Sequence, residues 1–148
     1  MQLTKFSDYA LRVLMYVAQG EGRPATIAEI ARAHGISRAH LMKVVNRLAQ
    51  RGYLTTQRGK GGGIALGRPA AGISVGQVVR DFETLPMVDC LVPSRDGACR
   101  LVSCCGLQHA VQLAQHEFMG ALDRRTLAEI SRISCRAQPA AAAASLAD

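Results

Sequence analysis

The stretch that decides the fold is IAEIARAHGISRAHLMKVVNRLAQRGYL, residues 27–54. Thr26 just before it and the Glu three residues later have the spacing of a capping box, which predicts the start of a short helix. Gly35 is free to take the left-handed conformation that ends a helix, and Ser37 is a suitable cap for a second one. A short helix, a turn with glycine and a second, more basic helix form the helix-turn-helix pattern.

The second helix has one apolar face and one polar face. Leu41, Val44, Val45 and Leu48 recur at helical spacing and predict the face that packs on a core. Basic and amide side chains occupy the remaining surface, as a recognition helix in a DNA major groove requires. The residues of this helix that we expect to contact DNA are Ser37, Arg38, His40, Lys43 and Asn46.

A strand is expected over residues 53–57 and its return over 64–66, with RGKGGG between them. A hairpin tip that is both basic and glycine-rich is typical of a wing, because it can approach a phosphate backbone closely. Arg58 could enter a narrow minor groove at an A·T-rich site, and Lys60 would lie beside it. We therefore expect a mainly α chain with a small β-hairpin wing, that is, a winged helix-turn-helix.

Charge is distributed unevenly along the chain. Residues 1–70 hold eleven Lys or Arg against three acidic residues, a net charge of +8, while residues 71–148 carry −1. A basic half joined to a near-neutral half indicates a nucleic-acid binder with a second function attached. A solvated basic surface without a partner is the alternative.

The second half of the chain begins with a capped helix from Ser74 to about Glu83. A longer helix follows, in which five apolar residues step by 4, 3, 4 and 3: Leu107, Val111, Ala114, Phe118 and Ala121. This seam favours a symmetric homodimer, although an ordinary core-facing helix is the alternative. Thr126 and the Glu three residues later predict a capped short helix.

These patterns suggest three regions in 148 residues. Residues 1–70 are the expected winged helix, 71–135 a cysteine loop with a dimerisation helix, and 136–148 a disordered, Ala-rich tail. No stretch approaches the roughly 20 apolar residues that span a bilayer, so we expect no membrane partner and a cytoplasmic location. Nothing resembles a catalytic triad, and we expect no enzyme.

Cys90, Cys99 and Cys105 have spacings of nine and six residues, with no strict CxxC. Structural zinc favours ligand pairs two to four residues apart, whereas an iron–sulfur cluster spreads its ligands over a larger object. Five cysteines are an odd number, which favours metal ligation over a disulfide framework. His109 and His116 could line one helix face as ligands, but such residues are more often polar flank positions.

The segments LTKFSDYALRVLMYVA, IAEIARAHGISRAHLMKVVNRLAQRGYL and RGKGGGIALG, together with the cysteine loop, resemble the iron–sulfur winged-helix transcription regulators of the IscR/NsrR type. The resemblance covers roughly residues 1–133. It implies a dimeric transcription repressor that binds a double-stranded, palindromic, A/T-rich operator and holds an iron–sulfur cluster.

Within the family, SRAHLMKVVNRL and CRLVSCCGL followed by TLAEI resemble the branch that senses nitric oxide. In that branch three cysteines and an aspartate from the other subunit hold the cluster, which implies Cys90, Cys99, Cys105 and Asp8 here, with [4Fe–4S] favoured and [2Fe–2S] possible. Cys104 stands beside Cys105, and either could ligate. From the residues alone, Asp8 is a charge that favours the helix dipole.

Three other interpretations stay open at this point. The same fold could sense iron–sulfur supply or redox state, or it could be a zinc-dependent regulator. An enzyme of cysteine redox chemistry is the third, and it would need turnover with a dithiol substrate.

Overall fold

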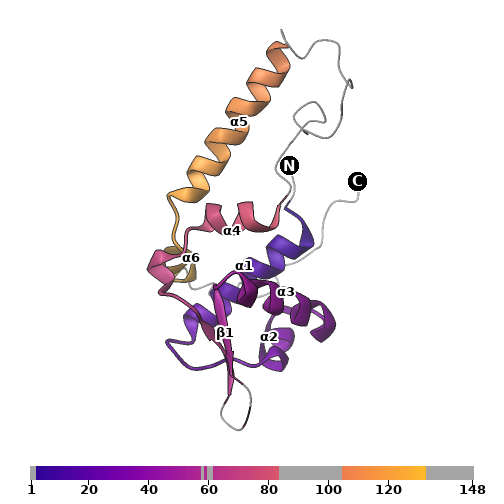
Figure 1. Ribbon diagram of the computed structural model, residues 1–148, viewed down its shortest axis with the longest axis vertical. Helices are drawn as coiled ribbons and strands as arrows, with labels where there is room; N and C mark the ends of the chain where they lie inside the picture. Colours follow the sequence, from indigo (N-terminus) through magenta and orange to yellow (C-terminus); the bar gives the residue numbers. More distant parts are fainter. Residues whose placement is uncertain (1–2, 58, 60–61, 84–104, 133–148) are drawn as a thin grey trace, which may run out of the picture.

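Six α-helices and one β-hairpin make up the described part of the chain (Figure 1). The computed structural model describes residues 3–57, 59, 62–83 and 105–132. The elements are α1 (Lys5–Gln19), α2 (Ile27–His34), α3 (Arg38–Gln50), β1 (Leu54–Gln57), β2 (Gly63–Leu66), the 3-10 turn η1 (Ala70–Gly72), α4 (Val75–Phe82), α5 (Gly106–Asp123) and α6 (Leu127–Arg132). The predicted fold class, mainly α with a small β-hairpin, is confirmed.

The predicted helix ends are formed by local hydrogen bonds. The Thr26 hydroxyl accepts from the Glu29 backbone N–H, and the Glu29 carboxylate accepts from the Thr26 backbone N–H at 2.7 Å. Gly35 ends α2 in the left-handed conformation with φ 63°, and the Ser37 hydroxyl accepts from the His40 N–H. These contacts fix the turn between α2 and α3, because each satisfies a backbone group that the helix end would leave unpaired.

A single hydrophobic core holds α1, α2, α3 and the hairpin together. The predicted apolar face of α3 is buried in full, at Leu41, Val44, Val45 and Leu48. Val13 and Leu14 of α1 are completely buried opposite it. Burial of one such side chain stabilises the fold by roughly 1.5–3 kcal/mol, so this face contributes strongly to holding α3 in the core.

The hairpin pairs β1 with β2 in antiparallel register, from Leu54 opposite Leu66 to Gln57 opposite Gly63. The segment before α2 adds two further hydrogen bonds, because Ala25 and Ile64 each donate to the carbonyl of the other at 2.9 and 2.7 Å. Gly63 approaches this segment so closely that a Cβ there would lie 2.9 Å from the Ala25 carbonyl oxygen. The base of the wing is therefore tied to the entrance of the helix-turn-helix.

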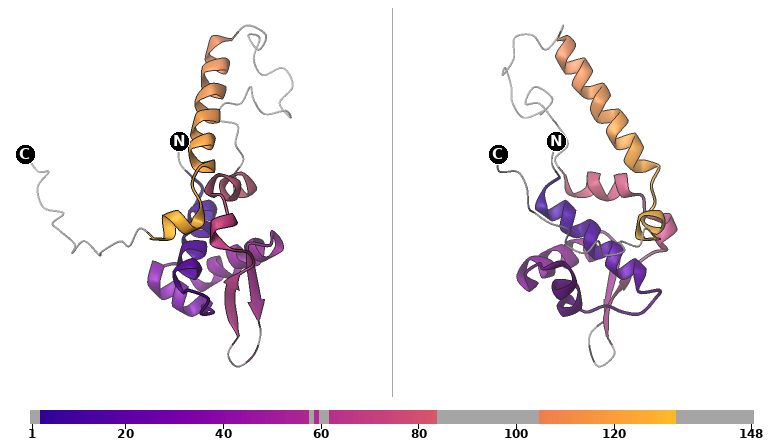
Figure 2. Two further views of the ribbon diagram at one scale, coloured as in Figure 1. Left: turned by 90° about the vertical axis from the view of Figure 1, so that its left-hand side faces the viewer. Right: turned by 180° about the vertical axis from the view of Figure 1, so that it is seen from behind.

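The region after residue 70 contributes to the same core. Ile73, Val78 and Leu127 belong to its buried cluster, and α6 packs against α1. The Gln19 side-chain amide donates to the Ser131 carbonyl at 3.1 Å. The chain thus leaves the winged helix after α4 and returns to it at α6 (Figure 2).

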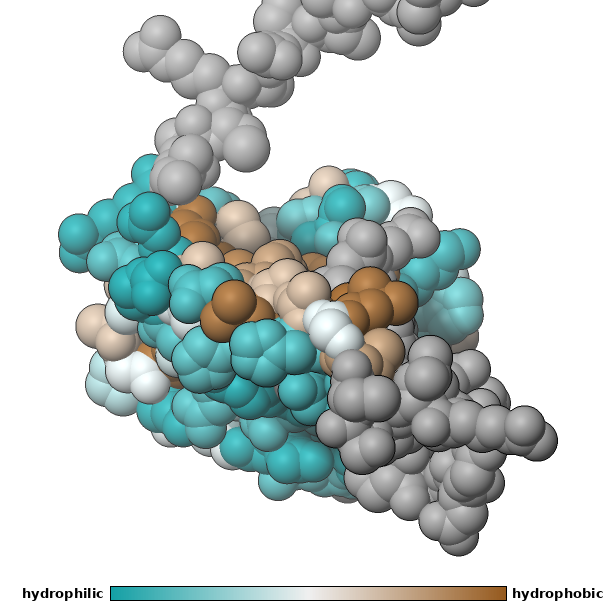
Figure 3. All heavy atoms as spheres, turned by 90° about the horizontal axis from the view of Figure 1, so that it is seen from above, coloured by the Kyte–Doolittle hydropathy of each residue, from teal (hydrophilic) through white to brown (hydrophobic). Residues whose placement is uncertain are grey.

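Helix α5 projects away from this core (Figures 1 and 2). Met119 is its buried residue, whereas Leu107 and Leu113 are 69% and 55% exposed. The predicted seam lies on a helix, as expected, with Val111 half-buried and the other four residues exposed. Figure 3 views the molecule from above its orientation in Figure 1. On that face, hydrophobic residues gather in the middle and hydrophilic residues lie around them.

Some predictions fall on residues that the structure does not describe. These are the cysteine loop over residues 87–104, the tail over 136–148, and the wing-tip residues Arg58 and Lys60. Within the described residues, no helix combines the length and the apolar character that crossing a membrane requires.

Candidate nucleic-acid interface and cysteine site

The exposed face of α3 carries the predicted DNA-contacting residues. Arg38, His40, Lys43 and Asn46 are all exposed, and α3 contains no acidic residue. Ser37 is exposed as well, but its hydroxyl already accepts the His40 N–H as the helix cap. An α-helix with its apolar face buried and a basic, acid-free face exposed has the form of a major-groove reading helix.

Helix α1 borders this face, which the sequence patterns did not indicate. A hollow of about 130 Å³ separates α1 from α3 and is walled by apolar surface from Phe6, Tyr9 and Val44. The rings of Tyr9 and His40 lie with centroids 6.5 Å apart, and Lys5 and Lys43 stand at its edge. The start of α1 therefore adds positive charge beside the exposed face of α3.

The C-terminal end of α3 is held by a buried tyrosine. Tyr53 is fully buried, and its hydroxyl donates to Asp81 of α4 at 2.6 Å. Arg51 reaches the same carboxylate at 3.4 Å, and the Arg68 guanidinium lies 4.4 Å above the Tyr53 ring. Burial, reinforced by the bond to Asp81, raises the pKa of Tyr53 to about 12, so the phenol stays neutral and remains a donor.

The wing places its described glycines as a tight turn requires. Gly59 has φ 106°, a conformation open to glycine, and its carbonyl accepts from the Gly62 N–H at 3.0 Å. The predicted contacts of Arg58 and Lys60 with DNA lie outside the described residues and stay predictions.

Of the three cysteines predicted as metal ligands, Cys105 is the one within the described residues. It occupies the position just before α5, half-buried, with a free thiol. Cys90, Cys99 and Cys104 lie outside the described residues. His109 and His116 are both exposed on α5, and no three His, Cys, Asp or Glu side chains form a metal-binding group within the described part of the chain.

Asp8 lies on the first turn of α1, half-buried, and both of its carboxylate oxygens accept from Arg12, at 2.9 and 3.0 Å. It lines an open cleft of about 620 Å³ together with Arg12 and His34. Burial, then the nearby Arg12 charge, lowers the pKa of His34, and its Nε2 has no hydrogen-bond partner among the described residues. The Asp8 carboxylate thus stands at an accessible surface, and among the described residues its side chain is paired with one guanidinium, that of Arg12.

Asp8 and Cys105 stand apart within one chain. Cys105 precedes the end of α5 that projects farthest from the winged helix, whereas Asp8 belongs to α1 in the core (Figures 1 and 2). A helix of 18 residues is about 27 Å long, so the far end of α5 is well removed from the core at its other end. One metal centre that used both residues would need them from different subunits.

A winged helix with an exposed basic helix and a long projecting helix defines a class of transcription regulators. The chain belongs to the Rrf2 family: the model of that family, described as an iron-dependent transcriptional regulator, matches residues 3–132. Family membership rests on this match, which spans all of the described residues.

Solved structures share the fold. The global cysteine regulator CymR of B. subtilis superposes with a TM-score of 0.71 at 21% identity, over 88% of this chain and 96% of that one. IscR of T. potens gives 0.71 at 24% identity, over 95% and 93%. CymR of Staphylococcus aureus gives 0.67 at 23% identity, over 87% and 97%. At these identities the likeness concerns the fold.

Proposed function

We propose that this chain is a homodimeric transcriptional repressor whose affinity for a palindromic operator is set by a nitric-oxide-sensitive iron–sulfur cluster. The observation that carries DNA binding is the exposed face of α3, which is basic, free of acidic residues and bordered by Lys5 of α1. Positive charge on this face neutralises phosphates, and the helix enters the major groove.

The proposed cluster ligands are Cys90, Cys99 and Cys105 of one subunit and Asp8 of the partner subunit. Two observations support this set: the Cys105 thiol lies at the outer end of α5, and the Asp8 carboxylate lies at an accessible surface. Thiolates are soft ligands that suit iron, while a carboxylate is a harder and more exchangeable one. When bound, such a cluster supplies an iron with one labile ligand, at which nitric oxide reacts.

Coupling to DNA follows from where these residues lie. Asp8 belongs to the helix that borders the exposed face of α3, and Cys105 to the end of a helix directed away from it. A bond between Asp8 and the partner's cluster would tie α1 of one subunit to the cysteine loop of the other. Loss of that bond would release the tie and alter the spacing of the two recognition helices.

DNA binding is tested with Lys43→Ala, and Arg132→Ala, which removes the same charge from an exposed position on α6, is the matched control. We expect Lys43→Ala to weaken operator binding by about 3- to 10-fold and to lower the slope of log affinity against log salt by about 1. Arg58→Ala should weaken binding most at A·T-rich sites. Equal affinities of Lys43→Ala and Arg132→Ala in a gel-shift titration would remove α3 from the interface.

The cluster is tested on protein purified without oxygen, by its absorption spectrum and by iron and sulfide analysis. We expect visible absorption that Cys90→Ala, Cys99→Ala and Cys105→Ala abolish, while Cys135→Ala and Cys104→Ala keep it. Asp8→Ala should hold the cluster less firmly and change its reaction with nitric oxide.

A colourless protein with bound zinc would support a zinc-dependent regulator. If the protein holds a cluster but its affinity for the operator does not change with nitric oxide, the result would support sensing of iron–sulfur supply or redox state.

A further inference from the structure

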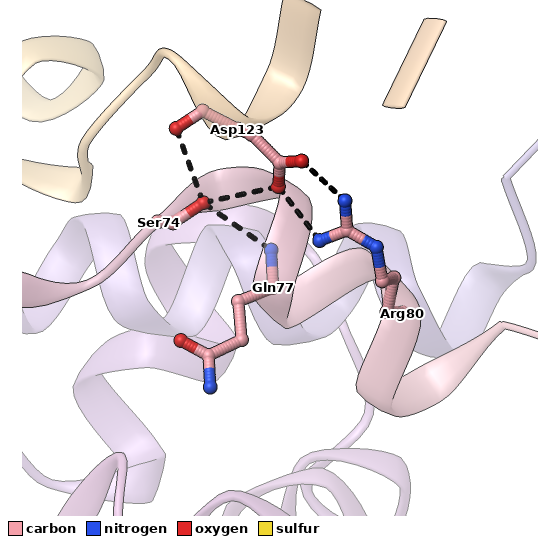
Figure 4. Close-up of polar contacts among 4 residues, drawn as sticks. All are labelled: Ser74, Gln77, Arg80 and Asp123. Carbon is pink, nitrogen blue, oxygen red and sulfur yellow. Dashed lines mark hydrogen bonds and ion pairs between the residues drawn. The ribbon is translucent and has the colours of Figure 1, made fainter. Parts of the chain in front are cut away.

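Helix α5 packs mainly against α4, and a small group of polar side chains holds their contact. We call Ser74, Gly76, Arg80 and Asp123 the α4–α5 joint. Figure 4 shows three of them, Ser74, Arg80 and Asp123, together with Gln77. We propose that this joint is a positioning device: it fixes the direction of α5 relative to α3 and thereby sets the separation of the two recognition helices. The inference rests on the proposed function, because it concerns the dimer on DNA.

The joint fixes Asp123 from several directions. Arg80 donates from Nη1 to one carboxylate oxygen of Asp123 at 2.7 Å, and its Nη2 pairs with the other oxygen. The Ser74 hydroxyl, which caps α4, also reaches the Asp123 carbonyl at 3.4 Å. A guanidinium that grips both carboxylate oxygens fixes an orientation as well as a distance. The last residue of α5 is thus oriented against both the N-cap and the last turn of α4.

The backbone beside the joint is fixed as well. Val75 donates to the Arg125 carbonyl at 2.9 Å, and Leu127 donates to the Ile73 carbonyl at 2.8 Å. Ile73 and Leu127 are fully buried in the core. These two hydrogen bonds join the segment at the start of α4 to the segment that follows α5. The joint therefore has a rigid base.

Gly76 makes the joint sensitive to a single methyl group. It is buried, and a Cβ at this position would lie 2.8 Å from the backbone nitrogen of Asp123 and would overlap the Asp123 carboxylate. Since a backbone atom is involved, a side-chain rotation cannot relieve the overlap, and the end of α5 must shift. Gly72 provides a matched control, because a Cβ added to it would have no atom within 4 Å.

The other side of α4 is fixed to the elements that face DNA. Asp81 accepts from Tyr53 and Arg51 at the end of α3, and Glu83 accepts from the N–H and hydroxyl of Thr4, the cap of α1. Helix α4 therefore relates the direction of α5 to that of α1 and α3. It also leads directly into residues 84–104, the segment of the cysteines.

The length of α5 turns a small change at the joint into a large one at its far end. Over about 27 Å, a rotation of ~10° moves the far end by roughly 5 Å, more than the ~3.4 Å by which a DNA duplex rises along its axis per base pair. A dimer built on α5 would then place its recognition helices about one base pair out of register. The Arg80–Asp123 ion pair of the joint is exposed, and exposed ion pairs contribute little to stability, so its role is orientation.

The test begins with operators that the wild-type dimer selects from a random duplex library. Wild type, Gly72→Ala, Gly76→Ala and Asp123→Asn are then titrated against that operator, against versions with one base pair added or removed between half-sites, and against a single half-site. Thermal unfolding of each variant is recorded in parallel. Asp123→Asn removes the charge that Arg80 grips without adding volume, so it serves if Gly76→Ala does not fold.

We expect wild type and Gly72→Ala to bind the altered spacings about tenfold or more weakly, the order of a lost base-pair contact. Gly76→Ala and Asp123→Asn should bind all spacings within about threefold, or prefer a spacing one base pair away, with half-site affinity unchanged. Wild-type spacing preference in both joint variants, or an equal loss on the half-site, would overturn the inference. If wild type selects no paired half-sites, the proposed function fails, and this inference with it.

Discussion

Helices α1 and α5 have similar lengths but opposite surroundings. Of the 15 residues of α1, five are buried, and its apolar side chains face α3, α4 and α6. Of the 18 residues of α5, Met119 is buried, while Leu107 and Leu113 remain largely exposed. Tertiary packing stabilises α1 within one chain, whereas the other described residues leave the apolar surface of α5 largely uncovered. A second copy of the chain is the partner that the proposed dimer supplies.

The largest effect is expected where α1 meets the core. Leu14→Ala removes a completely buried side chain and should lower the free energy of unfolding by about 2–5 kcal/mol. Leu107→Ala, the same change at a residue that is 69% exposed, should have little effect on unfolding of the dissociated chain. Urea unfolding of both variants checks the contrast, and equal losses would show that α5 is packed as firmly as α1.

A charge on α5 should separate assembly from folding. Phe118 is 38% exposed and belongs to the predicted seam, so Phe118→Glu would place a carboxylate inside a helix–helix interface. We expect the dimer to dissociate at least about 100-fold more readily, the order of 3 kcal/mol that an unpaired buried charge costs. Sedimentation velocity measures the dimer, and far-UV circular dichroism should still show the folded winged helix. An unchanged dimer would place the interface elsewhere.

Tyr53 connects the end of α3 to α4 through its hydrogen bond to Asp81. Removal of this bond should have a smaller effect than the two changes above. Tyr53→Phe should lower the free energy of unfolding by about 1.5–3 kcal/mol, the magnitude for a hydrogen bond to a charged group. Burial raises the pKa of Tyr53 from 10.0 to about 12. The stabilisation is therefore complete below pH 10 and declines as pH rises toward 12, because the unfolded phenol ionises first. Unfolding titrations at several pH values should show wild type and Tyr53→Phe converging across that window.

The smallest effect is expected at the cap of α6, where the chain returns from α5 to the core. The Thr126 hydroxyl accepts from the Glu129 N–H at 3.2 Å, so Thr126→Ala should lower stability by about 1 kcal/mol. Thr26→Ala removes the matching cap of α2 and should have a similar effect. If Thr126→Ala alone is silent in thermal unfolding, α6 contributes little to the core.

Sequence reasoning predicted what depends on near neighbours. The caps at Thr26, Ser37 and Thr126 and the buried face of α3 follow from spacings of three or four residues, which a local pattern records. The hydrogen bond from Tyr53 to Asp81 joins residues 28 positions apart, and no local pattern indicates it. The joint between Arg80 and Asp123 spans 43 positions and was missed for the same reason.

The candidate site was predicted in part. The exposure of Arg38, His40, Lys43 and Asn46 follows from the helical period of α3, and the structure places all four at the surface. The border that α1 adds through Lys5 and Tyr9 needs tertiary packing and had no sequence signal. The choice of Asp8 came from a family resemblance, since a ligand from another subunit leaves no spacing pattern in a single chain.

The packing of α6 on α1 has a consequence for synthesis of the chain. The hydrogen bond from Gln19 to Ser131 joins residues 112 positions apart, so the core stays incomplete until nearly all of the described chain has left the ribosome. By that time α5 has already emerged, and its apolar side chains are available to a neighbouring chain. Nascent copies on one messenger could therefore pair through α5 before their winged helices finish folding.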